Sequence, residues 1–104
     1  MQRQYTSDIQ LPERIDYTHM RQAVDVLAIF DIGALSPRPI RFKIMDHGIK
    51  TTVKVTDIRD IEWIGAGGTT RIEYDCVTVS DGRHITYKLL YFYRECKWEL
   101  ETCS

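Results

Sequence analysis

Three kinds of residue in this sequence could carry chemistry, and the first is a glycine-rich stretch. The segment "GAGGTT", residues 65–70, has the composition of a loop that holds phosphate groups. Such a loop needs a Gly-Lys-Ser/Thr ending and a following helix whose N-terminus faces the anion. Here no lysine follows the glycines, and the next segment, "RIEYDCVTV", alternates like a strand. We therefore predict that Gly65, Gly67 and Gly68 only let the chain turn between strands.

The second kind comprises metal ligands and nucleophiles, which are scattered. The histidines and cysteines show neither C-x-x-C nor H-x₃-H spacing, so the pattern of a structural zinc site is missing. The acids of "TDIRDIEW" lie close together, and we interpret them as part of a solvated connection. They are Asp57, Asp60 and Glu62. We predict no catalytic residue, no metal and no cofactor; an enzyme with a dispersed site is an alternative, because catalytic residues are brought together by space and not by order.

The third kind is a set of basic residues in "PRPIRFKIMDHGIKTTVKV", residues 37–55. A tight turn at His47-Gly48 would put the apolar side chains on one face of a hairpin and most of the basic ones on the other. The basic set is Arg38, Arg41, Lys43, Lys50 and Lys54. Arg41 then lies directly across from Lys54, a like-charge pair that is mildly destabilising.

This basic face has two interpretations. It could bind an anion, either nucleic acid or an acidic protein, since small barrels often bind on one sheet face. Alternatively, its lysines only keep an exposed strand from aggregating. The face has no row of exposed aromatic residues on which bases could stack, so nucleic acid is not the favoured partner.

The clearest structural element is a hairpin centred on Asp81-Gly82, the pair favoured in a type I′ turn. Its predicted core pairs are Ile72 with Tyr91, Tyr74 with Leu89, Cys76 with Tyr87, and Thr78 with Ile85. On the other face the predicted pairs are Asp75 with Lys88 and Val79 with His84. A further turn around Arg94-Glu95 places Trp98 opposite Tyr91 and Leu100 opposite Leu89. Two independent turns thus predict the same core face.

An apolar strip remains on the other face of this hairpin. Leu90 and Phe92 lie opposite the core face, beside Lys88. They could form a covered second core under the N-terminal arm or a partner surface. We expect cover by the arm or a symmetric dimer contact.

The chain of 104 residues is the size of one domain, and its net charge of −1 gives no global attraction to nucleic acid or membranes. Residues 1–23 read as a polar arm, either disordered or holding one short helix after Thr18. Residues 24–104 read as a single antiparallel β domain. Val24–Asp31, "VDVLAIFD", fits a strand or the end of that helix, and its β-branched content favours the strand.

The predicted fold is all-β: a meander of five to six antiparallel strands curled into a small SH3-like or half-open barrel. A flat sheet with one covering helix is the alternative. The N-terminus has no apolar signal region, and no run approaches the roughly 20 apolar residues of a membrane span. We expect a cytoplasmic protein without a membrane partner.

Several segments in order resemble a group of small uncharacterised bacterial proteins. They are "VDVLAIFD", "PRPIRFKI", "VKVTDIRD", "GAGGTTRIEYDCVT" and "KWELE", which together span about residues 24–101. The resemblance implies that Val24–Asp31 is a strand, and it implies no activity. This chain departs from the pattern in its longer N-terminal arm and in its last turn, residues 93–96.

These observations favour a small non-catalytic interaction module that binds a protein partner or itself. Nucleic-acid or anion binding through the basic face is the alternative, and an enzyme with a dispersed site is a third.

Overall fold

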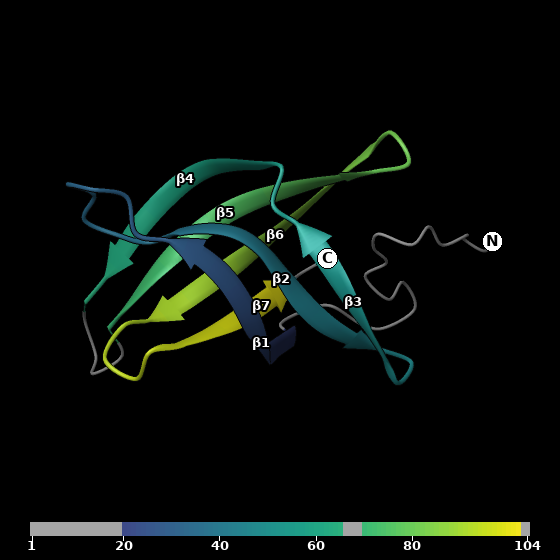
Figure 1. The fold of residues 1–104 in the computed structure, drawn as a ribbon, viewed down its shortest axis with the longest axis horizontal. Coiled ribbons are helices and arrows are strands. Elements are labelled where there is room, and N and C mark those ends of the chain that lie inside the picture. The colour runs from purple at the N-terminus through teal and green to yellow at the C-terminus, as the bar shows by residue number, and fades with distance from the viewer. Residues whose placement is uncertain (1–19, 66–69, 103–104) are drawn as a thin grey trace.

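The computed structural model describes residues 20–65 and 70–102, which form one antiparallel sheet of seven strands with order β3-β2-β1-β7-β6-β5-β4 (Figure 1). The strands are β1 (Met20–Ile29), β2 (Arg38–Asp46), β3 (Ile49–Lys54), β4 (Asp57–Ile64), β5 (Arg71–Ser80), β6 (Arg83–Phe92) and β7 (Lys97–Thr102). The all-β prediction is confirmed. The described residues contain no helix, and hence none long and apolar enough to cross a membrane.

The predicted number of strands is wrong, because a seventh strand, β4, occupies the segment that we interpreted as a solvated connection. A bulge between Ile58 and Asp60 interrupts the pairing of β4 with β5. The bulge places an extra residue between the inward-facing positions Ile58 and Ile61, so the two-residue alternation of a strand is lost from the sequence.

Tight turns set the register of the hairpins, as predicted. Asp81 and Gly82 have φ values of 53° and 75°, which a type I′ turn requires at both central positions. His47 and Gly48, at 51° and 79°, form the equivalent turn between β2 and β3. Every cross-strand pair predicted for β5–β6 and for β6–β7 is present. The turn at His47-Gly48 predicts the pairs Ile44–Thr51, Phe42–Val53 and Ile40–Val55. The first two are present in the ladder, and the Val55 N–H donates to the Ile40 carbonyl at 2.9 Å.

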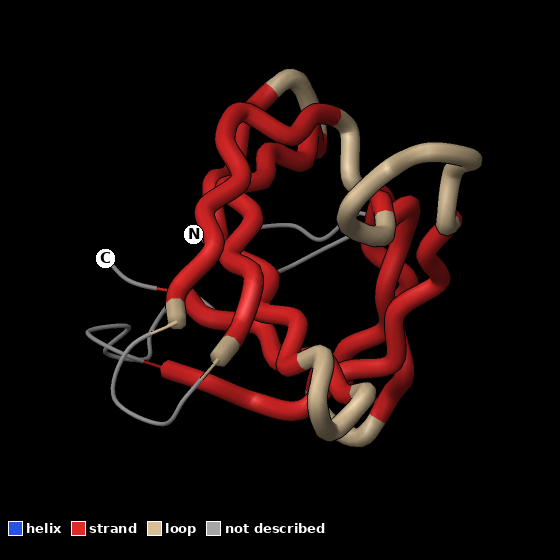
Figure 2. The backbone as a smooth tube through the Cα atoms, turned by 90° about the vertical axis from the view of Figure 1, so that its left-hand side faces the viewer, coloured by secondary structure: helices blue, strands red, loops and turns tan. Residues whose placement is uncertain are grey.

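Strand β1 divides its pairing between two neighbours, and this bends the sheet. Its first half, Met20–Val24, pairs with β7, and its second half, Asp25–Ile29, pairs with β2. The β1–β2–β3 part of the sheet thereby folds over the β4–β7 part. Figure 2 shows the strands, in red, wrapped around a common interior.

The sheet does not close into a barrel, because its edge strands β3 and β4 do not pair with each other. They are joined by the corner Val55-Thr56, whose consecutive amides bond to opposite parts of the sheet. The Val55 N–H donates to the Ile40 carbonyl at 2.9 Å, and the Thr56 N–H donates to the Val77 carbonyl at 2.9 Å. The curled sheet is thus fastened at this corner and open beyond it.

The core lies between the two parts of the bent sheet. Its buried cluster comprises Phe42, Ile44, Val53, Ile72, Tyr74, Cys76, Tyr87, Leu89 and Leu100. The buried Tyr74 hydroxyl donates to the Pro37 carbonyl at 2.6 Å, which ties the loop before β2 to β5. We call the face that points away from this cluster the outer face.

The N-terminal boundary differs from the prediction. Strand β1 starts at Met20, inside the predicted arm of residues 1–23, and Val24–Ile29 continues it, so the helix alternative for this stretch is wrong. Residues 1–19 lie outside the described residues, as do residues 66–69 with Gly67 and Gly68. The glycine-rich segment connects the paired strands β4 and β5, so the next described element after it is a strand.

Candidate interaction surface

The predicted basic residues of β2 and β3 share the outer face of their hairpin. Arg41 lies directly opposite Lys54, as predicted, while Lys43 faces Thr52 and Lys50 faces Met45. All four basic side chains are exposed. None has an ion pair with a described side chain. On the neighbouring strand β1, the exposed Asp25 lies directly opposite Lys43, whereas Arg41 lies opposite Leu27.

Arg38, the fifth predicted residue, is separate from the other four because it has a partner. Its guanidinium donates two hydrogen bonds to the Asp31 carboxylate, at 2.9 and 3.1 Å. The hydrogen bond from Arg38 lowers the pKa of Asp31, and the same bond raises the pKa of Arg38. Arg38 thus holds the ends of the β1–β2 loop together, and its charge is largely offset.

Exposed apolar side chains adjoin the basic ones along β1. In the β1–β2 register Leu27 lies opposite Arg41 and Ile29 lies opposite Arg38, so an apolar column runs beside the basic column of β2. Both apolar side chains are close to half exposed. Neighbouring strands lie about 4.8 Å apart, so the two columns form one continuous surface.

The loop after β1 extends this apolar column. Phe30 is 72% exposed, Leu35 is 88% exposed, and Ile32 is fully exposed. The loop is nevertheless ordered by a turn in which the Ala34 N–H donates to the Asp31 carbonyl at 3.0 Å and Gly33 takes φ of 81°. Turn positions usually carry polar residues, so an apolar side chain at this tip needs an explanation outside the turn.

We name this combined surface the apolar–basic face. It consists of Leu27, Ile29, Phe30, Ile32 and Leu35 with Arg41, Lys43, Lys50 and Lys54. The alternation of β2 and β3 predicted the basic half of this face, and no pattern used above predicted its apolar half. The signal was present in "LAIFDIGAL", where a turn marked by Asp and Gly carries large apolar residues.

The predicted partner strip on β6 has a different environment. Leu90 and Phe92 do point away from the core cluster, yet they are only 0% and 7% exposed. The Lys97 ammonium lies 5.5 Å from the centre of the Phe92 ring and covers part of it. A partner would reach these side chains only by displacing the atoms that cover them, and their role in partner binding stays a prediction.

Strand β4 places acids on the outer face at the other edge of the sheet. Asp57, Asp60 and Glu62 are exposed, and they lie on a strand instead of in the connection that we predicted. The β4–β5 register sets Asp60 directly opposite Asp75 and Glu62 directly opposite Glu73. These are like-charge pairs, as is Arg41–Lys54 in the basic hairpin.

The outer face of β5 and β6 compensates part of this negative charge. Glu73 is buried and accepts hydrogen bonds from Arg71 at 2.7 Å and from Lys88 at 3.2 Å. Burial alone would raise the pKa of Glu73, but the bonds from the two cations outweigh it, and the net effect lowers the pKa. Asp75 also lies 3.8 Å from the Lys88 ammonium.

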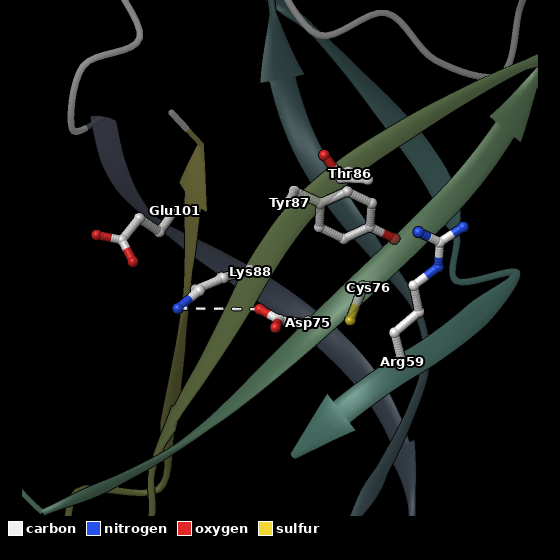
Figure 3. Close-up of a pocket in the computed structure, with 7 residues that line it drawn as sticks. All are labelled: Arg59, Asp75, Cys76, Thr86, Tyr87, Lys88 and Glu101. Atoms are coloured by element: carbon white, nitrogen blue, oxygen red, sulfur yellow. Dashed lines mark ion pairs between the residues drawn. The ribbon is translucent and has the colours of Figure 1, made fainter. Parts of the chain in front are cut away.

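A hollow of about 420 Å³ lies beside these charges (Figure 3). Its lining residues are Arg59, Asp75, Cys76, Thr86, Tyr87, Lys88 and Glu101. Figure 3 shows the Lys88–Asp75 ion pair within it. Neither His84 nor any of the acids Asp57, Asp60 and Glu62 lines this hollow.

The hollow offers no activated nucleophile. Burial raises the pKa of the Cys76 thiol to about 12, so this sulfur stays protonated at neutral pH. Burial also raises the pKa of the Tyr87 hydroxyl, which shares a 2.6 Å hydrogen bond with Thr78. The described residues include no group of three or more histidines, cysteines or acids placed to hold a metal ion.

Comparisons with known proteins add no functional constraint. No protein-family model matches the chain, and no curated protein or solved structure matches it either. The resemblance to small uncharacterised bacterial proteins thus stays a prediction.

Proposed function

We propose that this protein is a small binding module whose interaction surface is the apolar–basic face. The observation that carries the proposal is the ordered turn at Asp31–Ala34, which holds Ile32 fully in solvent between Phe30 and Leu35. Clustered exposed apolar side chains are typical of interaction sites, whereas single ones are scattered over ordinary protein surfaces.

The arrangement of the surface supports a protein partner with both apolar and acidic groups. The apolar loop would supply the buried anchor of such an interface, because large apolar side chains lose the most water on binding. Arg41, Lys43 and Lys54 would flank that anchor and favour partners of opposite charge. Exposed basic side chains contribute to the association rate and to specificity, and their contribution falls as ionic strength rises.

Nucleic acid is the second candidate, supported by four exposed basic side chains without an ion-pair partner in the described ranges. It predicts binding that weakens steeply with salt, with a slope that shrinks when Lys43 or Lys54 is neutralised. Flat fluorescence anisotropy with single- and double-stranded probes at low salt would remove this candidate. The apolar column beside the basic one favours protein over nucleic acid.

A two-residue substitution tests the proposal. Ile32→Ser with Leu35→Ser removes the apolar anchor while leaving the fold intact, because neither side chain is buried. Affinity purification of the tagged chain from its own cell, with quantitative mass spectrometry, should show partner recovery reduced at least about tenfold, the equivalent of about 1.4 kcal/mol.

The matched control is Val79→Ser, which removes an exposed apolar side chain from β5, near the Asp81-Gly82 turn. Recovery with this variant should equal that of the wild type. Equal recovery from all three proteins would contradict the assignment of the apolar–basic face as the binding surface.

A further inference from the structure

The apolar–basic face has a counterpart of opposite charge on the same chain. Edge strand β4 exposes Asp60 and Glu62, which lie directly opposite Asp75 and Glu73 of β5. Like charges directly opposite each other are unfavourable in a sheet. Neither Asp60 nor Glu62 has an ion-pair partner in the described part of the chain. The chain thus carries a basic surface and an acidic surface, and the cations Arg71 and Lys88 offset only the β5 members of the acidic pairs.

The acidic strand also exposes apolar side chains. Ile61 and Trp63 lie opposite the core residues Tyr74 and Ile72, yet they are 44% and 51% exposed. They are exposed because β4 is an edge strand that β3 leaves unpaired. The Trp63 ring packs against Tyr93 on one side, with ring centres 5.8 Å apart. We name Asp57, Asp60, Ile61, Glu62 and Trp63 the acidic–apolar strand.

We infer that the partner of the apolar–basic face is a second copy of this chain, which presents its acidic–apolar strand. The inference rests on the proposed function and names its partner. The two surfaces match in charge sign; on β4 the exposed Ile61 and Trp63 lie on the opposite face of the strand from Asp60 and Glu62, so the match rests on charge.

The spacing of the charges also matches. Arg41 and Lys43 are two residues apart on β2, and Asp60 and Glu62 are two residues apart on β4. Each pair is therefore separated by about 6.7 Å along its strand, twice the rise per residue. Two cations of one copy can lie over two acids of the other without a change in either strand.

Overall charge permits this contact. The net charge of −1 leaves no strong long-range repulsion between copies. The attraction between exposed charges is screened over about 10 Å at roughly 0.1 M salt. We therefore expect self-association that strengthens with protein concentration and weakens as salt is added.

Charge reversal of each surface tests the inference. One variant carries Arg41→Glu with Lys54→Glu, and the other carries Asp60→Lys with Glu62→Lys. Sedimentation velocity over a concentration series at low ionic strength should show the wild type associating. Each variant alone should sediment as a monomer, with a dissociation constant at least about tenfold higher, because like-charged surfaces now meet.

An equimolar mixture of the two variants is the decisive sample. Each reversed surface then meets a surface of opposite charge, so the mixture should associate to the wild-type extent. The control variant is Arg83→Glu with Lys97→Glu, which changes the net charge as much as the first variant and lies outside both surfaces; it should associate like the wild type.

Two results would overturn the inference. They are a wild type that stays monomeric at every concentration and salt, and a mixture that fails to associate. The proposed function is tested separately. If the chain is monomeric but Ile32→Ser with Leu35→Ser still loses a partner from its cell, the binding surface stands and the second copy is wrong.

Discussion

The β2–β3 and β5–β6 hairpins have the same turn type and the same division into a core face and an outer face. They differ in how charged residues are paired across the outer face. Both turn through two residues of positive φ, and both give one face to the core cluster. On the outer face of β5–β6, Asp75 lies opposite Lys88, and Glu73 is held by two cations. On the outer face of β2–β3, Arg41 lies opposite Lys54.

The difference separates charge that stabilises the fold from charge that does not. Glu73 and its cations are partly buried and hydrogen-bonded, so they contribute to the native state of the isolated chain. Arg41 and Lys54 are exposed and repel each other, so their benefit has to come from solubility or from a partner. The exposed apolar column beside them favours the partner.

Removing the hydrogen bonds of Thr78, which join the β5–β6 hairpin to the β2–β3 hairpin, should change the free energy of unfolding most. The buried Thr78 hydroxyl of β5 donates to the Lys54 carbonyl of β3 at 2.7 Å and bonds the Tyr87 hydroxyl at 2.6 Å. Thr78→Val leaves both groups without this partner, so we expect the free energy of unfolding to fall by about 2–3 kcal/mol. Urea unfolding of dilute protein measures this loss of unfolding free energy. Thr86→Val, at an exposed position of β6, should change it by less than about 0.5 kcal/mol, and equal losses would contradict the role of Thr78.

Removing the charge of Glu73 should have an intermediate effect. At neutral pH Glu73→Gln should lower the free energy of unfolding by about 1–2 kcal/mol, since Arg71 and Lys88 lose a charged acceptor. The folded pKa of Glu73 lies below its ordinary 4.5. Its contribution is therefore complete above pH 4.5 and is lost as the pH falls through the lower, folded pKa.

The pH dependence supplies the control for that substitution. Urea unfolding at a series of pH values should show the difference between wild type and Glu73→Gln shrinking below pH 4.5. Glu62→Gln, at the opposing exposed position of β4, should cost nothing at neutral pH because it relieves a like-charge pair. A constant difference across the acid range would argue against an ionised Glu73 in the fold.

Placing an opposite-charge pair across β2 and β3, like the pair across β5 and β6, should have the smallest effect on the free energy of unfolding. The effect should be stabilising. Lys54→Glu gives Arg41 an opposite charge directly across the strands, so we expect a gain of about 0.2–1 kcal/mol in dilute urea unfolding. Lys50→Glu faces Met45 and should give no such gain. A loss of stability in Lys54→Glu would show that Arg41 and Lys54 do not repel each other.

Local turn chemistry made much of this fold predictable. The pairs Asp81-Gly82 and His47-Gly48 require positive φ, so they fixed two registers and with them the two faces of four strands. Strand β4 could not be recognised in this way, since its bulge breaks the alternation. The pairing of β1 with both β7 and β2 depends on contacts across most of the chain, which no local pattern specifies.

The candidate surface was predictable in part for the same reason. The basic face followed directly from the β2–β3 register, including the Arg41–Lys54 pair. The exposure of Ile32 did not, because an apolar residue in a loop is equally compatible with burial under another segment. The acidic pairs Asp60–Asp75 and Glu62–Glu73 required the register of the strand that the sequence concealed.

The corner between β3 and β4 has a consequence for how the molecule opens. Two adjacent amides, those of Val55 and Thr56, are bonded to strands on opposite sides of the interior. Fraying of β3 from β2 would release the first proton to solvent, and detachment of the corner from β5 would release the second. The relative hydrogen-exchange rates of the Val55 and Thr56 amides therefore report whether β3 opens from β2 before the corner detaches from β5. Equal rates would mean that the two openings occur in one cooperative event.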